Sequence, residues 1–213
     1  MTRDRDSIIA AMTEELTPVR RFRYGDGVIL VSFALFLSVL GVAYVNGLWS
    51  GIVKVEAAPF FWITNGLLLL LGLASASAAI AAASPYVGNR HDAPRWATAM
   101  VGVLPLAALI SLLPDGHGMA IVEDPVGIHC FTHALATSSF TGAALILWLR
   151  RGAPVSLNLA GWHAGLAAGA LGAVAYGLSC PLNAVTHLGV WHVLPVALAA
   201  VIGRLAVPRL VSW

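Results

Sequence analysis

The residues of this chain that could do chemistry are two cysteines and the histidines around them. Thiolate and imidazole groups are the ligands that zinc and other soft or borderline metal ions prefer, and two thiols can also form a disulfide. The candidate side chains are Cys130, Cys180, His129, His133, His187 and His192. Their spacing matches no standard zinc motif, so it predicts a transient site for zinc or another soft metal ion rather than a permanent one.

The cysteine pair has three interpretations at the level of sequence. Cys130 and Cys180 stand at corresponding ends of two hydrophobic segments that a short turn joins, so their Cα atoms could meet the separation of about 4.4–6.8 Å that a disulfide needs. The pair could form a structural disulfide, could stay as two separate thiols, or could respond to oxidants and metal ions. Most of the seven histidines lie on the side that bears both cysteines, which favours a responsive pair.

The composition indicates which elements must position these residues. The chain has 213 residues, of which 59% are hydrophobic and only 10% are charged, whereas a soluble domain carries about 25% charged residues. Because this polar surface is too small to cover a water-soluble globule, the sequence predicts an all-α integral membrane protein. The 12 basic residues are scattered and the net charge is +2, which argues against direct nucleic-acid binding.

Six segments are apolar over the length of about 20 residues that a membrane helix requires. They comprise residues 28–48, 60–83, 96–113, 133–149, 159–178 and 187–205. Alternation of these six transmembrane helices places Lys54 on one side of the membrane and every other basic residue on the opposite side. Because basic loops stay in the cytoplasm, both termini are expected to be cytoplasmic, and both cysteines are expected at the outer ends of their helices.

The polar start of the chain, residues 1–25, is expected to form a cytoplasmic head, and residues 26–213 a six-helix transmembrane sensor bundle. Apolar side chains recur at helical spacing in the head, which predicts a short amphipathic helix. Such a helix could lie on the lipid bilayer or dock onto a cytosolic partner. Glu14 and Glu15 favour the partner, because anionic lipid repels acidic side chains.

Glycines predict close helix packing in the fifth segment. Gly161, Gly165 and Gly169 recur at four-residue spacing, and small residues four apart allow helix backbones to approach closely. The pattern predicts either a compact bundle within one chain or the contact surface of a homodimer.

Two other functional classes fit the sequence less well. A membrane thiol oxidoreductase linked to quinones would need a Cys-x-x-Cys pair, and the chain has none. A small metal transporter coupled to ions would need carboxylates across its spans, and the six segments carry none. Ser179 with His187 lacks a third group that would orient the histidine for nucleophilic catalysis. The sequence therefore predicts a protein that is not an enzyme.

Short motifs at both ends of the chain carry a resemblance to a known family. They comprise Asp6, Ser7, Ile8 and Ile9, then Glu15, Leu16, Thr17, Pro18, Val19, Arg20, Arg21 and Phe22, then Cys180 and Pro181, then Val190, Trp191, His192, Val193, Leu194 and Pro195, and last Gly203 and Arg204. With six spans and Cys130 opening the fourth span, the chain resembles the NrsF family of bacterial inner-membrane anti-sigma factors over nearly its whole length.

The resemblance implies a function and residues that perform it. In that family a short head holds an extracytoplasmic-function sigma factor, and two cysteines are needed for its release under stress such as heavy metals. The implied stress-sensing residues are Cys130 and Cys180. The implied sigma-factor-binding residues are Ile8, Ile9, Met12, Glu15, Leu16, Pro18 and Val19. Members often carry acidic residues after the second cysteine, whereas residues 181–184 have none, so no acidic metal ligand is implied there.

Overall fold

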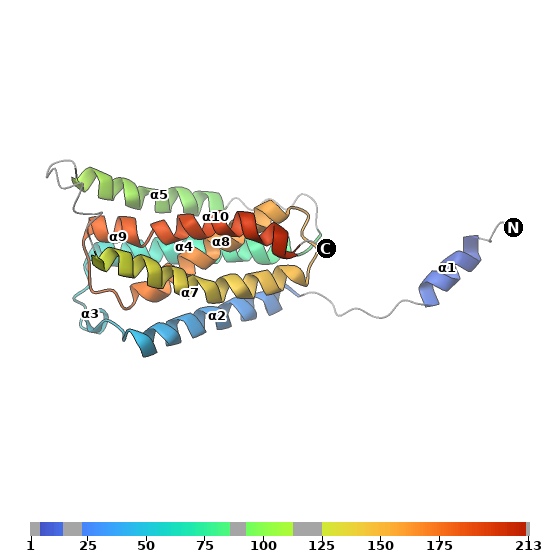
Figure 1. The fold of residues 1–213 in the computed structure, drawn as a ribbon, viewed down its shortest axis with the longest axis horizontal. Coiled ribbons are helices and arrows are strands. Elements are labelled where there is room, and N and C mark those ends of the chain that lie inside the picture. The colour runs from blue at the N-terminus through green and yellow to red at the C-terminus, as the bar shows by residue number, and fades with distance from the viewer. Residues whose placement is uncertain (1–4, 15–22, 86–92, 113–124, 212–213) are drawn as a thin grey trace.

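The structure of the chain is a computed structural model that describes residues 5–14, 23–85, 93–112 and 125–211. Every regular element in these residues is a helix, which confirms the predicted all-α class. The helices are α1 (Arg5–Glu14), α2 (Tyr24–Val45), α3 (Ser50–Val53), α4 (Pro59–Ala82), α5 (Ala93–Leu112), α7 (Pro125–Arg150), α8 (Leu157–Gly177), α9 (Val185–Trp191) and α10 (Leu194–Val211). The start of α2 and the end of α10 lie at one end of the bundle, and α9 lies at the other (Figure 1).

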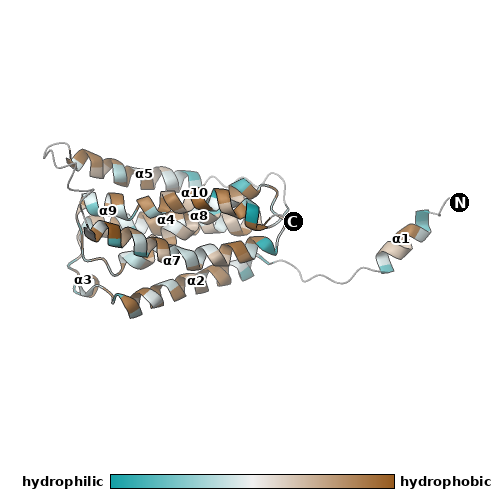
Figure 2. Cartoon of the chain, viewed as in Figure 1, coloured by the Kyte–Doolittle hydropathy of each residue, from teal (hydrophilic) through white to brown (hydrophobic). Residues whose placement is uncertain are grey.

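Five helical stretches are long and apolar enough to cross a membrane. They are Tyr24–Val45, Pro59–Ala82, Ala93–Leu112, Val126–Arg150 and Val185–Val211. Hydrophobic residues run along the length of these helices (Figure 2). Large apolar side chains such as Phe36, Leu109 and Ile202 are exposed on the outside of the bundle, as expected for surfaces that meet lipid acyl chains. The chain is therefore a multi-pass membrane protein, and five of the predicted spans are confirmed.

The remaining predicted segment, residues 159–178, forms α8, which is the central helix of the bundle. It packs against α4, α7 and α10 (Figure 1), and 16 of its 21 residues are buried. The Ser156 hydroxyl accepts a hydrogen bond from the backbone N–H of Leu159 and caps its start. Because neighbouring helices surround α8, its small Gly and Ala residues serve packing, and few large apolar side chains are needed to face lipid.

The spaced glycines of α8 form a seam with α10 inside the same chain. A Cβ atom at Gly165 would clash with the carbonyl oxygen of Ala199, and one at Gly161 would clash with the carbonyl oxygen of Gly203. A Cβ atom at Gly203 would in the same way clash with the carbonyl oxygen of Gly161. The prediction of close backbone approach is confirmed, and the glycines that carried it are covered by α10.

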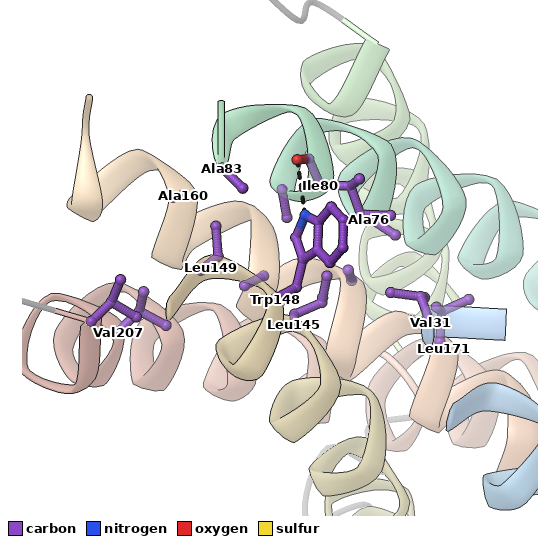
Figure 3. Close-up of a cluster of buried hydrophobic side chains, with 14 residues drawn as sticks. Val31, Ala76, Ile80, Ala83, Leu145, Trp148, Leu149, Ala160, Leu171 and Val207 are labelled. Carbon is purple, nitrogen blue, oxygen red and sulfur yellow. Dashed lines mark hydrogen bonds between the residues drawn. The ribbon is translucent and has the colours of Figure 1, made fainter. Parts of the chain in front are cut away.

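A cluster of buried hydrophobic side chains packs α2, α4, α7 and α8 against one another at the end of the bundle where α7 ends. Its centre is Trp148, whose indole N–H donates a hydrogen bond to the carbonyl oxygen of Ile80 at 3.1 Å (Figure 3). Gly27 of α2 lies directly against both side chains and leaves no room for a Cβ atom. The first membrane helix is thus anchored to α7 close to the residue where it begins.

The helices differ from the predicted segments in two places. The helix that carries Cys130 begins at Pro125 rather than at residue 133, so Cys130 lies inside its second turn. The segment expected as one helix over 187–205 is interrupted between Trp191 and Leu194. Pro195 explains the interruption, because in a continuous helix its ring would clash with the carbonyl of Trp191 and its missing N–H would leave that carbonyl unbonded.

Candidate functional site

The packing of α7 on α8 brings the first cysteine to the α9 end of the bundle. The Thr137 hydroxyl donates a hydrogen bond to the carbonyl oxygen of Gly172 at 3.0 Å, and Ser138 lies where a side chain on Gly172 would be. These contacts fix the register of the two helices. Cys130, two turns before Thr137, consequently faces the interior, and only 2% of its surface is exposed.

The second cysteine follows α8 in a turn. The backbone N–H groups of Ser179 and Cys180 donate hydrogen bonds to the carbonyl oxygens of Tyr176 and Gly177. Pro181 then directs the chain away, because it cannot supply the N–H that a continuing helix needs. The turn holds the Cys180 side chain in the interior, where 1% of its surface is exposed.

The two histidines come from α9 and from the break that follows it. His187 lies near the start of α9, and His192 comes directly after its last residue. Close contacts hold α9 in place, since Gly189 lies against α5 and the Trp191 indole covers Gly127 near the start of α7. Both imidazoles are buried, His192 completely and His187 with 5% of its surface exposed.

These four side chains form one group, the Cys130–Cys180–His187–His192 cluster. One ligand atom from each residue lies within 4.8 Å of the other three. The two Sγ atoms are 3.7 Å apart, and Sγ of Cys180 is 3.5 Å from Nε2 of His187. In a tetrahedral zinc site the bond lengths imply about 3.8 Å between two sulfurs and about 3.6 Å between sulfur and nitrogen. The donor set and its spacing fit a zinc-like divalent ion.

The surroundings of His192 support the same conclusion. Neither of its ring nitrogens has a hydrogen-bond partner among the described residues. A buried polar atom that is left unbonded costs about 1–3 kcal/mol, and a metal ion would bond one of the two nitrogens. The cluster therefore consists of polar side chains that are enclosed in an otherwise apolar interior.

The cluster also changes the acidity of one thiol. Hydrogen bonding from the Cys130 thiol, with a smaller contribution from His187, lowers the pKa of the Cys180 thiol, although burial acts in the opposite direction. The thiolate is the form that binds metal ions and attacks disulfides or oxidants.

The predicted ligands divide into two groups in the structure. Cys130, Cys180, His187 and His192 come together, whereas His129 and His133 lie beside the cluster on another side of α7. Tyr176 was not among the predicted site residues, and its ring contacts both His133 and His192. Its position in the sequence, one helical turn before Cys180, could have indicated that it lies beside the cysteine.

The predicted sigma-factor-binding residues lie partly on α1. Ile8, Ile9 and Met12 are on this helix and are exposed, as are all its other residues. The remaining four, Glu15, Leu16, Pro18 and Val19, lie outside the described residues.

Comparison with known proteins identifies the family. The family described as "Negative regulator of sigma F" (NrsF) matches residues 12–213. The chain is 27% identical over 157 residues to the "Probable anti-sigma-F factor NrsF" of Azospira oryzae, and 29% identical over 160 residues to the "Anti-sigma-F factor NrsF" of Caulobacter vibrioides. Each match covers 73% of both chains. No solved structure matches. The chain therefore belongs to the NrsF family of anti-sigma-F factors, which are regulators and not enzymes.

Proposed function

We propose that this protein holds an extracytoplasmic-function sigma factor at the bacterial inner membrane and releases it when the Cys130–Cys180–His187–His192 cluster binds a metal ion or is oxidised. The observation that carries the proposal is the convergence of two thiols and two imidazoles in the interior of an anti-sigma-F factor. Such a cluster has no need to exist for packing alone, because apolar residues of similar volume would fill the space at lower cost.

The proposed orientation places the cluster toward the periplasm. Arg23 before α2, Arg150 at the end of α7 and Arg209 at the end of α10 mark the ends of helices that alternate across the bundle. Lys54, just after α3, belongs to the opposite end. If α8 also crosses the membrane, the chain has six spans and the positive-inside rule makes the arginine-bearing end cytoplasmic. The cluster then faces the periplasm, from which metal ions and oxidants arrive.

The proposed binding site for the sigma factor is the head, residues 1–25. Ile8 and Met12 stand one turn apart on α1, and Ile9 is beside them, so their exposed side chains form an apolar stripe. A helix of this kind binds by inserting its apolar side chains into a groove of the partner. Leu16, Pro18 and Val19 would extend the contact, and Glu14 and Glu15 would meet the basic surface that a sigma factor uses for DNA or polymerase.

A physical connection between cluster and head supports the switch. Cys130 lies near one end of α7 and Trp148 near the other, about 27 Å apart at 1.5 Å per residue. Trp148 packs against Gly27 of α2, and α2 leads directly into the head. A metal ion or a disulfide would change the distance between α7 and the turn at Cys180. Movement of α7 would then alter the packing of Trp148 on α2.

The energy available is sufficient for such a switch. Moving a sigma factor from 99% bound to 99% free requires about 5.5 kcal/mol of differential affinity. A disulfide that closes a loop of this size contributes about 4 kcal/mol in the chain-entropy model. Structural zinc sites bind with apparent free energies of about 10–16 kcal/mol. Oxidation could therefore supply much of the change. Metal binding could supply the part of its free energy by which the ion binds the released state more tightly than the holding state.

The experiment is capture of the sigma factor encoded by the same genome, using full-length protein in nanodiscs. Wild-type protein is expected to retain it, and Ile8→Asp is expected to lose it. Ala10→Asp is the matched control, because it adds the same charge on the opposite face of α1 and should retain binding. Zinc or diamide should release the sigma factor from wild-type protein and not from Cys130→Ser/Cys180→Ser protein. Equal retention by Ile8→Asp and Ala10→Asp would refute the proposed head interface.

A further inference from the structure

The cluster is enclosed, so an ion needs a route to it. The four ligand residues are 0–5% exposed, and a metal site requires an access path as well as ligands. Two more imidazoles lie at the same end of α7 as Cys130. They are on a different face of the helix, which reaches the surface. His129 is exposed and His133 is half-buried.

These two imidazoles lie against each other on one face of α7. They are four residues apart, and their rings are tilted relative to each other, with centroids 3.8 Å apart and an interplanar angle of 35°, so rotation of one side chain would let both rings bind one ion. Two histidines at this spacing on one helix face are a recurring metal-binding arrangement. The pair offers only two nitrogens and no thiolate, so water would complete the coordination, and binding would be weaker than at the cluster.

The tautomer of His133 is set for metal binding. Its Nδ1 atom lies 3.0 Å from the carbonyl oxygen of His129. A carbonyl oxygen can only accept, so Nδ1 carries the proton and donates it, and Nε2 keeps its lone pair. Metal-binding histidines commonly donate their other ring N–H to a backbone carbonyl in this way. Nε2 is therefore the nitrogen of His133 that is left to bind a metal ion.

Tyr176 connects the surface pair with the cluster. The ring centroid of Tyr176 is 5.3 Å from that of His133, 6.2 Å from that of His129 and 6.5 Å from that of His192. His192 is in turn 5.7 Å from His187. Tyr176 is 5% exposed. Its ring contacts histidines of both groups, so its displacement would open a connection between the surface pair and the cluster.

We infer that His129 and His133 form an acquisition site that takes up a borderline divalent metal ion from solution and passes it beyond Tyr176 to the buried cluster. This inference rests on the proposed function of the cluster as a metal sensor. In the transfer, the two nitrogen–metal bonds of the surface pair and the bonds from the metal ion to water break, and two sulfur–metal and two nitrogen–metal bonds form at the cluster. The displaced water enters the solvent, each proton carried by a thiol goes to water, and no electron is transferred. The stronger thiolate ligands make the transfer directional.

The test separates the rate of metal loading from its equilibrium. Co²⁺ is mixed rapidly with full-length protein in nanodiscs, and the thiolate-to-cobalt absorption reports filling of the cluster. His129→Gln/His133→Gln is expected to slow filling about tenfold while the final absorption and the equilibrium affinity stay unchanged. Thr132→Gln, an exposed neighbour on the same turns, is the matched control and should fill at the wild-type rate. Tyr176→Ala should speed both filling and removal by a chelator.

The outcomes distinguish this inference from the proposed function. Wild-type filling rates in the His129→Gln/His133→Gln protein would overturn the acquisition site and leave the cluster intact. Absence of the thiolate absorption from wild-type protein would overturn the cluster as a metal site, and the transfer with it. The surface pair can also be tested by itself, with Cu²⁺ and electron paramagnetic resonance of Cys130→Ser/Cys180→Ser/His187→Gln/His192→Gln protein, which lacks all four ligands of the cluster. Nitrogen coordination should be present there, and its persistence after His129→Gln/His133→Gln would overturn the inference.

Discussion

The Sγ atoms of Cys130 and Cys180 lie 3.7 Å apart in the interior, although 50 residues separate them in the chain. A disulfide bond is about 2.05 Å long, whereas two sulfurs on one zinc ion are about 3.8 Å apart. The pair is close enough for either state, and the two states exclude each other because both consume the same thiolates.

This exclusion predicts that zinc protects the thiols from oxidation. Wild-type protein treated with diamide should form the Cys130–Cys180 disulfide, and zinc added first should slow its formation at least about tenfold. Thiol labelling with a maleimide polymer after denaturation measures the fraction oxidised. Ser179→Ala is the control for changes near the turn and should behave as wild type. An oxidation rate that is the same with and without zinc would contradict a shared site.

His192 should limit stability when no metal is bound. His192→Leu fills a similar volume and removes two buried nitrogens that lack hydrogen-bond partners among the described residues, so the metal-free protein should gain about 1–3 kcal/mol. The same change should abolish high-affinity zinc binding. His187→Leu is the contrast, because Nε2 of His187 lies 3.5 Å from Sγ of Cys180, and its loss should destabilise. Thermal unfolding in detergent with a chelator present gives both values, and a destabilised His192→Leu protein would contradict the assignment.

The α8–α10 seam should tolerate no added methyl group. Gly165→Ala would bring a Cβ atom against the carbonyl oxygen of Ala199, which forces α10 outward and should cost about 1–3 kcal/mol. Gly66→Ala in α4 is the matched control, because nothing lies within 4 Å of its Cβ position. That variant should be neutral or more stable by up to about 1 kcal/mol, since alanine favours helix. Equal unfolding temperatures for the two variants would refute tight packing at the seam.

Membrane topology is predicted by the basic residues and by α8. Lys54→Cys, Arg151→Cys and Arg209→Cys can each be placed in Cys130→Ser/Cys180→Ser protein, and all three positions are exposed. An impermeant maleimide added to intact spheroplasts should label the first and spare the other two. Labelling at residue 209 but not at residue 151 would mean that α8 does not cross the membrane, because the number of spans between these positions would then be odd.

The class of the protein and most of its helices could be predicted from the amino-acid sequence alone. Low charge and long apolar segments require a membrane, whatever the tertiary packing, and short motifs were enough to indicate the NrsF family. The apolar spacing in the head predicted a helix, and α1 (Arg5–Glu14) is one; the role of the head stays a prediction, and Glu15, Leu16, Pro18 and Val19 lie outside the described residues. The weakest prediction was the sixth segment, where Pro195 interrupts a helix whose hydrophobicity is continuous.

Helix packing brings particular cysteines and histidines together, and the spacing along the chain could not indicate which ones. His129 and Cys130 are adjacent in the chain, but successive side chains on a helix point about 100° apart, so one faces outward and the other inward. Whether His187 and His192 could reach the thiols depended on the break between α9 and α10 and on how α9 packs against α5 and α7. Composition and spacing describe residues by their order in the chain. The four side chains of the cluster come from segments that meet only when the helices pack.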